Sequence, residues 1–153
     1  MTEAARPARP DEAAALRALA RAAYAPYVPR LGFEPPPMRQ DFPADIAAAA
    51  VWVIGEPPLG FVVARASGED WLIENVARAP DAPRGLGRRL MAAAEAEGAC
   101  RGFARAVLYT HERMAENRAL YPRLGWTEIA RREEDGLPRV FFAKSLAAAD
   151  APR

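Results

Sequence analysis

The sequence predicts a mixed α/β (α+β) domain built around one central sheet. Short apolar runs typical of strands occur at 51–55, 60–65, 71–78 and 106–110, and apolar residues recur at helical spacing at 11–27 and 86–98. The order of strand, loop, helix and strand between 71 and 110 is typical of a crossover that joins parallel strands. A chain of 153 residues can form one domain with a full core. We therefore expect a single domain over 1–153, with flexible ends at 1–3 and 149–153.

Composition excludes several classes of function. The formal net charge is +1, so no global basic field favours nucleic acid. The longest apolar run, 46–55, is too short to span a membrane, and the amino terminus lacks the pattern of a signal peptide. Cys100 is the single cysteine, so the chain cannot form an internal disulfide. With His111 as the single histidine, the chain offers few ligands for a metal site. We expect a cytoplasmic protein that binds neither nucleic acid nor membrane and holds no metal.

The first half of the chain is expected to begin with a short segment at 4–8 and a helix within 11–27. Prolines cluster between 26 and 43, which predicts a mostly irregular segment with at most a short helix, forming a wall beside the sheet. The runs at 51–55 and 60–65 predict a hairpin, and 71–78 predicts the next strand.

The second half predicts two helices and a closing hairpin. A helix at 86–98 carries apolar residues on its inner side, and a second helix covers 115–124. Strands at 127–132 and 139–146 flank an Asp135-Gly136 turn signal. The inner residues of the first of these helices are Leu86, Leu90, Met91 and Ala94.

The stretch PRGLGRRLM at 83–91 predicts an anion site. Gly85 and Gly87 permit close approach of the backbone, while arginines at 84, 88 and 89 crowd positive charge at a helix start that is already positive. A phosphorylated ligand would offset that repulsion; the alternative is a tight turn with solvated arginines. No Gly-Lys-Ser/Thr triplet occurs, and Leu90 stands where a dinucleotide fingerprint needs glycine, so nucleotide triphosphates and NAD are disfavoured.

Nearly the whole chain resembles the GNAT superfamily of acetyl-CoA-dependent N-acetyltransferases. The segments that carry the resemblance are IENVARAP, RGLGRRLM, LYTHERMAENRALYPRLGW and, more loosely, RREEDGLPRVFFAKSL. The resemblance implies a mostly antiparallel mixed sheet whose fourth and fifth strands splay apart. It also implies acetyl-CoA as acyl donor in that wedge, an amine as acceptor, and a monomer or homodimer. Ala82 and Pro83 depart from the family pattern, which leaves open an acyl-CoA-binding or sensing module without turnover.

The resemblance also implies roles for individual residues. Tyr121 would protonate the leaving thiolate of coenzyme A as general acid, the alternative being a packed core tyrosine. Glu74 would be the general base, either directly or with an ordered water, the alternative being a solvated glutamate. Asn117 would be a helix cap or a pantetheine contact. The residues expected to bind the cofactor are Asn75, Val76, Ala77, Arg78, Arg84, Gly85, Leu86, Gly87, Arg88, Arg89 and Asn117.

Three further expectations concern the surroundings of this site. Acceptor specificity is expected to lie in the segment 26–43 and in the hairpin 127–142. His111 could replace Glu74 as base, although a surface role fits a lone histidine better. Cys100 is expected to be a small packing residue.

Overall fold

The computed structural model describes residues 4–146, so the flexible ends expected at 1–3 and 149–153 lie outside the described residues. The chain divides into two compact units. Unit 1 comprises Met1–Arg65 and Asn75–Ala94, and unit 2 comprises Ala66–Glu74 and Glu95–Arg153. The expectation of a single domain stays a prediction.

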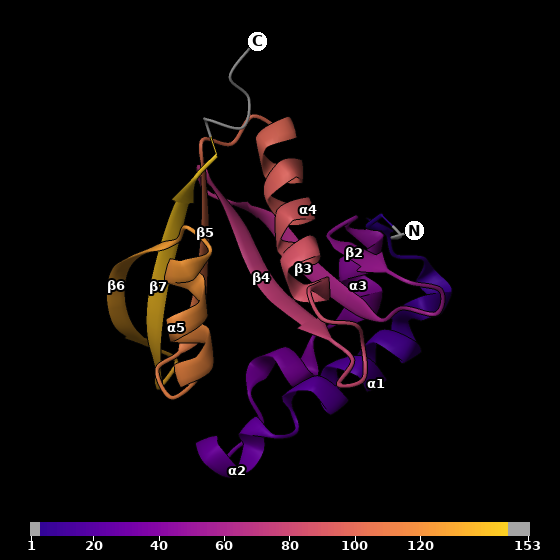
Figure 1. The fold of residues 1–153 in the computed structure, drawn as a ribbon, viewed down its shortest axis with the longest axis horizontal. Helices are drawn as coiled ribbons and strands as arrows, with labels where there is room; N and C mark the ends of the chain where they lie inside the picture. Colours follow the sequence, from indigo (N-terminus) through magenta and orange to yellow (C-terminus); the bar gives the residue numbers. More distant parts are fainter. Residues whose placement is uncertain (1–3, 147–153) are drawn as a thin grey trace. The chain divides into compact units, whose positions relative to one another are not determined.

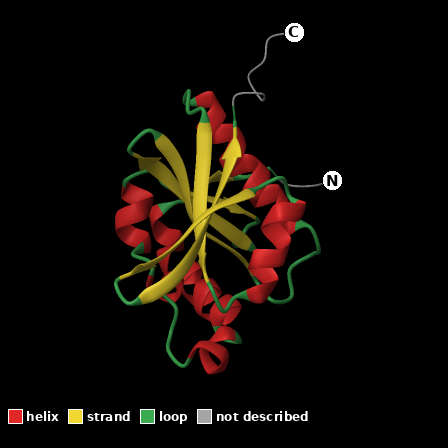
Figure 2. Ribbon diagram, turned by 90° about the vertical axis from the view of Figure 1, so that its left-hand side faces the viewer, coloured by secondary structure: helices red, strands yellow, loops and turns green. Residues whose placement is uncertain are grey.

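The described residues form helices and strands in the predicted mixed α/β pattern (Figure 2). Seven strands make one open mixed sheet in the order β1-β2-β3-β4-β5-β7-β6, which confirms the predicted fold class. The strands are β1 Arg6–Pro7, β2 Val51–Ile54, β3 Gly60–Ser67, β4 Asp70–Arg78, β5 Arg105–His111, β6 Thr127–Glu134 and β7 Leu137–Ser145.

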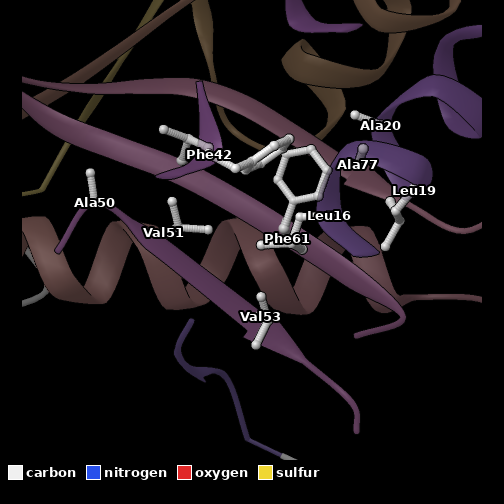
Figure 3. Close-up of a cluster of buried hydrophobic side chains, with 10 residues drawn as sticks. Leu16, Leu19, Ala20, Phe42, Ala50, Val51, Val53, Phe61 and Ala77 are labelled. Atoms are coloured by element: carbon white, nitrogen blue, oxygen red, sulfur yellow. The ribbon is translucent and has the colours of Figure 1, made fainter. Parts of the chain in front are cut away.

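The core of unit 1 forms between its first helix and its strands. A short 3-10 turn, η1 Pro10–Glu12, leads into α1 Ala13–Tyr24. Apolar residues at helical spacing bury one face of α1 against strand residues, because that face meets the pleated surface of β2 and β3. Figure 3 shows the cluster, in which the rings of Phe42 and Phe61 meet edge to face at 5.1 Å. The labelled members from α1 are Leu16, Leu19 and Ala20.

The proline-rich segment is more helical than the sequence predicted. It contains α2 Tyr27–Leu31, η2 Pro36–Arg39 and α3 Phe42–Ala47. Prolines occupy the first positions of η2 and α3, where the missing N–H costs no helical hydrogen bond. Asp41 accepts a hydrogen bond from the backbone N–H of Ala44 at 3.2 Å and so caps α3. The expectation of a mostly irregular segment was therefore wrong. Proline at the first positions of a helix is compatible with helical structure, and here it begins two short helical elements.

The predicted hairpin and the predicted inner face of the next helix are both present. Strands β2 and β3 pair antiparallel. Helix α4, Leu86–Cys100, begins in unit 1 and buries Leu86 and Leu90. A Cβ added to Gly60 of β3 would lie 2.8 Å from Leu90 and 2.9 Å from Leu86. The absence of a side chain at Gly60 therefore lets this helix approach β3.

Unit 2 contains the parallel pair and the closing hairpin. The pairing of β4 with β5 joins Trp71 to Ala106 and Leu72 to Val107, as predicted for the beginning of a splayed pair. Strand β7 pairs antiparallel with both β5 and β6. Asp135 and Gly136 form the predicted turn with φ of 53° and 77°.

Helix α5, Ala115–Arg123, packs on these strands, and Figure 1 shows it in orange beside β7. Cys100, the last residue of α4, is exposed, so the expectation that it packs was wrong. Within the part of the chain that the structure describes, no helix is long and apolar enough to cross a membrane.

Candidate active site

The start of α4 in unit 1 has the backbone geometry of an anion site. Gly85 adopts φ of +87°, a conformation that L side chains rarely adopt. The N–H of Arg89 donates to the carbonyl of Gly85 at 3.1 Å. This bond closes the first helical turn, so the amides of residues 86–88 precede it and have no partner within the helix. Those amides and the helix dipole favour an anion at this end.

The side chains of this segment divide between core and surface. Arg84 and Arg88 are exposed, Arg89 is half-buried, and the side chain of Leu86 is 2% exposed. Leu86 can therefore meet a ligand through its backbone alone. A Cβ on Gly87 would meet nothing within 4 Å, so the fold leaves open space where a ligand could approach the backbone.

The two departures from the family pattern take ordered positions in the loop. The N–H of Ala82 donates to the carbonyl of Ala79 at 2.9 Å, and Ala82 is buried. Arg78 donates from Nη1 to the carbonyl of Ala82 at 3.3 Å. Pro83 has no N–H to offer a ligand. The loop is thus held by its own hydrogen bonds, and Arg78 takes part in holding it.

Strand β4 alternates between buried and half-buried side chains along its length. Asn75, in unit 1, is 3% exposed, and its side chain is fully engaged with other elements of that unit. The side chain of Asn75 therefore has a structural task. Backbone pairing of Asn75, Val76, Ala77 and Arg78 with a pantetheine arm stays a prediction.

Tyr121 lies on α5 in unit 2 and is 8% exposed. Its ring lies 5.6 Å from that of Phe142 and 6.4 Å from that of Trp126. The carbonyl of Tyr121 accepts hydrogen bonds from the N–H groups of Leu124 and Trp126, each at 3.0 Å. The rings of Phe142 and Trp126 therefore hold the Tyr121 ring in place, and its role as general acid stays a prediction.

Asn117 lies one turn before Tyr121 and contacts β5 through its amide nitrogen. Nδ2 lies 3.2 Å from Oγ1 of Thr110 and 3.5 Å from Sδ of Met114. The structure assigns Met114 as the cap residue of α5, so Asn117 is inside the helix and does not cap it. Of the two roles open from the sequence, the pantetheine contact is the one that remains as a prediction.

Glu74 lies on β4 in unit 2, half-buried, and the alternation of side chains along the strand puts it on the same face as Leu72. Its charge acts on Tyr109 of β5, a residue that the sequence analysis missed. Burial raises the pKa of Tyr109 first, Arg139 opposes that rise, and the carboxylates of Glu74 and Glu134 add to it. The apolar run at 106–110 gave no signal that the charge of Glu74 acts on Tyr109, because a tyrosine in a buried strand is ordinarily a packing residue.

His111 and Glu134, which lies near the turn of the hairpin 127–142, each have a local partner. Nδ1 of His111 accepts a hydrogen bond from the backbone N–H of Arg113 at 3.0 Å, and burial together with Arg113 lowers the pKa of the imidazole. Glu134 pairs with Arg139 at 3.0 Å. The first contact lies at the end of β5, and the second joins the end of β6 to β7.

The sheet is open and mixed, and β4 and β5 form its parallel pair. A helix that follows β4 begins with glycine and arginine residues. Together these features are those of the acyl-CoA N-acyltransferase fold. The model of the acetyltransferase (GNAT) family matches residues 14–126. The chain belongs to this family, and the protein is accordingly an acyltransferase. No curated protein matches the chain.

Solved structures share the fold at low sequence identity. The PaiA N-acetyltransferase of Thermoplasma acidophilum, solved in complex with coenzyme A, aligns with a TM-score of 0.77 at 14% identity, covering 95% of this chain and 99% of that chain. A GCN5-related N-acetyltransferase of Rhodopseudomonas palustris gives 0.73 at 22%, covering 95% and 96%. A GNAT-family acetyltransferase of Listeria monocytogenes gives 0.71 at 14%, covering 94% of each chain.

Proposed function

We propose that the protein is a cytoplasmic enzyme that transfers an acetyl group from acetyl-CoA to a primary amine of a small molecule or a protein. Residues 84–89 hold the diphosphate of the cofactor, and the backbone of 75–78 pairs with its pantetheine arm. Asn117 contacts the pantetheine arm from α5. Tyr121 is the general acid and Glu74 the general base.

The reaction is a direct attack. The amine nitrogen, deprotonated by Glu74 directly or through water, bonds to the thioester carbon. The carbon–sulfur bond then breaks, and its electron pair leaves on sulfur. The Tyr121 hydroxyl donates its proton to that thiolate, whose conjugate thiol has a pKa of about 8.5 by analogy with cysteine. The nitrogen, which carries a surplus proton after the attack, passes it through water to the Tyr121 phenolate as the amide forms. The products are an amide and coenzyme A.

The observation that carries the proposal is the start of α4. Gly85 at φ +87° directs the chain into a helix that Arg84 precedes and whose first turn carries Arg88 and Arg89. Three cations at the positive end of a helix dipole repel one another unless an anion with several charges offsets them. Membership of an acetyltransferase family makes the diphosphate of coenzyme A the fitting anion.

A second candidate is a binding module that holds acyl-CoA without turnover. Pro83, which lacks an N–H, and Ala82, whose N–H is already used at 2.9 Å, favour it because each removes a donor for the diphosphate. The exposed Arg84 and Arg88 compensate for these donors in the enzyme hypothesis.

One experiment separates the two functions. The protein is incubated with acetyl-CoA and, in turn, with polyamines, amino acids, aminoglycosides and peptides with free amino termini, and released coenzyme A is measured with a thiol reagent. We expect release that depends on one class of amine, with the acetylated amine identified by mass spectrometry. Tight binding of acetyl-CoA without release in the presence of any amine would favour the binding module.

A further inference from the structure

Five side chains of unit 1 form one continuous path of hydrogen bonds. Nη2 of Arg65 donates to Oδ1 of Asp45 at 2.6 Å, and Nε2 of Gln40 donates to Oδ2 of the same carboxylate at 2.7 Å. Nδ2 of Asn75 donates to Oε1 of Gln40 at 2.9 Å. The Tyr24 hydroxyl lies 2.7 Å from Oδ1 of Asn75. We call these residues the wall network: Tyr24, Gln40, Asp45, Arg65 and Asn75.

The direction of each bond in the wall network is set by groups that can only accept. The Asp45 carboxylate requires the nitrogen of Gln40 to face it, so Oε1 of Gln40 faces Asn75. The carbonyl of Pro37, 3.2 Å from Nδ2 of Asn75, requires the nitrogen of Asn75 on that side. Oδ1 of Asn75 therefore faces Tyr24, whose hydroxyl donates. Asn75 is 3% exposed, so leaving its side-chain amide unpaired would destabilise the fold.

The wall network joins two segments that the proposed function uses differently. One is β4, where the Tyr24 hydroxyl also lies 3.1 Å from the carbonyl of Val76, inside the stretch 75–78 proposed to pair with pantetheine. The other segment contains Gln40, which follows η2, and Asp45, which lies inside α3. Gln40 belongs to the segment 26–43 expected to select the acceptor, and Asp45 lies just beyond it. Hydrogen-bonded side chains thus connect the backbone of β4 with the segment 37–45.

We propose that Asn75 and Tyr24 are positioning residues for the segment 36–45, and that pairing of acyl-CoA with β4 tightens this segment through them. This inference rests on the proposed function. Pairing with pantetheine restrains the backbone of Asn75 and Val76, and their partners Gln40, Pro37 and Tyr24 lose freedom with them. Coupling between two sites is reciprocal. If bound acyl-CoA orders the segment 36–45, it favours binding of the amine, and a bound amine that orders this segment favours binding of acyl-CoA.

Hydrogen exchange of the amides of Met38, Arg39 and Gln40, with and without saturating acetyl-CoA, tests the inference. Pro36 and Pro37 have no exchangeable backbone N–H. The amides of Met38, Arg39 and Gln40 therefore report on the end of η2 and on the residue that follows it. In the wild type we expect acetyl-CoA to slow their exchange at least about fivefold, the lower end of typical coupling between sites. In Tyr24→Phe and in Gln40→Ala, at equal saturation with acetyl-CoA, we expect less than half of that slowing.

Glu34→Gln is the matched control. It removes the exposed ion pairs that Glu34 forms with Arg21 of α1 at 3.0 Å and with Arg39 of η2 at 3.9 Å, but leaves the wall network intact. The control should keep the wild-type slowing. Tyr24→Phe and Gln40→Ala replace half-buried side chains, so each is checked for an unfolding transition before exchange is measured.

The possible results separate this inference from the proposed function. Binding of acetyl-CoA by calorimetry without slower exchange at 38–40 in the wild type would overturn the inference and leave the function standing. Equal slowing in the two wall-network variants would also overturn it, because the path would then not be needed. An absence of acetyl-CoA binding would overturn the proposed function, and this inference with it.

Discussion

The guanidinium of Arg139 lies 4.3 Å from the centre of the Tyr109 ring. The ring lies on β5, and Tyr109 is also within the electrostatic influence of Glu74 on β4. The cation lowers the pKa of Tyr109, whereas burial and the carboxylate of Glu74 raise it. The phenol of Tyr109 is thus a reporter of the charge on Glu74.

Glu74→Gln should lower the pKa of Tyr109, because removal of a nearby negative charge makes the phenolate less unfavourable. Ultraviolet titration of tyrosinate measures the shift, and Tyr109→Phe assigns the signal. With an identified acceptor, the same variant should turn over at least about tenfold more slowly at neutral pH and recover as the amine deprotonates at high pH. Wild-type turnover at neutral pH would assign the base to ordered water instead.

Replacing Arg88 and Arg89 together by alanine should weaken the affinity for acetyl-CoA, because two cations at the start of α4 are removed. The loss should become smaller at high salt, since screening already weakens these charges in the wild type. Calorimetric titration at two salt concentrations measures it. Unchanged affinity at low salt would return the arginines to a solvated role.

Gly87→Ala separates binding from folding. Gly87 is the second residue of α4; the new Cβ would meet nothing within 4 Å, and alanine favours the helical conformation more than glycine does. We therefore expect an unfolding free energy equal to or higher than that of the wild type. The affinity for acetyl-CoA should fall, because the Cβ occupies space proposed for the diphosphate. An unchanged Kd would show that no ligand approaches Gly87 closely.

Glu12 in unit 1 should make stability depend on acid pH. Two hydrogen bonds from Arg6, at 3.0 and 2.7 Å, lower the pKa of this buried carboxyl to about 2 from 4.5, with Arg9 adding to the effect. A pKa lowered by folding stabilises the protein above the unfolded value and ceases to do so as pH falls toward 2. The shift corresponds to about 3 kcal/mol.

Urea unfolding between pH 6 and pH 2 measures this contribution, on a scale of about 1.4 kcal/mol for each unit of pKa shift. The wild type should lose stability over the acid part of that range. Glu12→Gln should be less stable at neutral pH and show a flatter dependence. Parallel curves for the two proteins would contradict the assignment to Glu12.

The elements that determine the class of the protein could be predicted from local pattern. Leu86 and Leu90 recur at helical spacing, Asp135-Gly136 is a strong hairpin signal, and the strands alternate, so each feature is visible within a few residues. The proline-rich segment was less predictable. The same prolines suit an irregular chain or a helix start, and the choice depends on caps such as Asp41 and on burial of Phe42.

The candidate site was predictable where a motif is contiguous in sequence, as at 83–91. Tyr109 and the wall network were not predictable from local pattern. Asn75 and Gln40 are 35 residues apart in the chain, and their hydrogen bond follows from how η2 folds onto β4. Tertiary pairing of this kind leaves no periodic signal in one sequence.

The central claim is acetyl transfer with Tyr121 as general acid, and amine-dependent release of coenzyme A by Tyr121→Phe tests it most directly. Phenylalanine keeps the ring that packs on Phe142 at 5.6 Å, so stability and acetyl-CoA affinity should remain while the proton donor is lost. General acid catalysis contributes about 100-fold to 10,000-fold, and we predict a fall in turnover of at least tenfold even if water partly substitutes. Turnover at the wild-type rate would contradict the account, because Tyr121 would then be a packing residue.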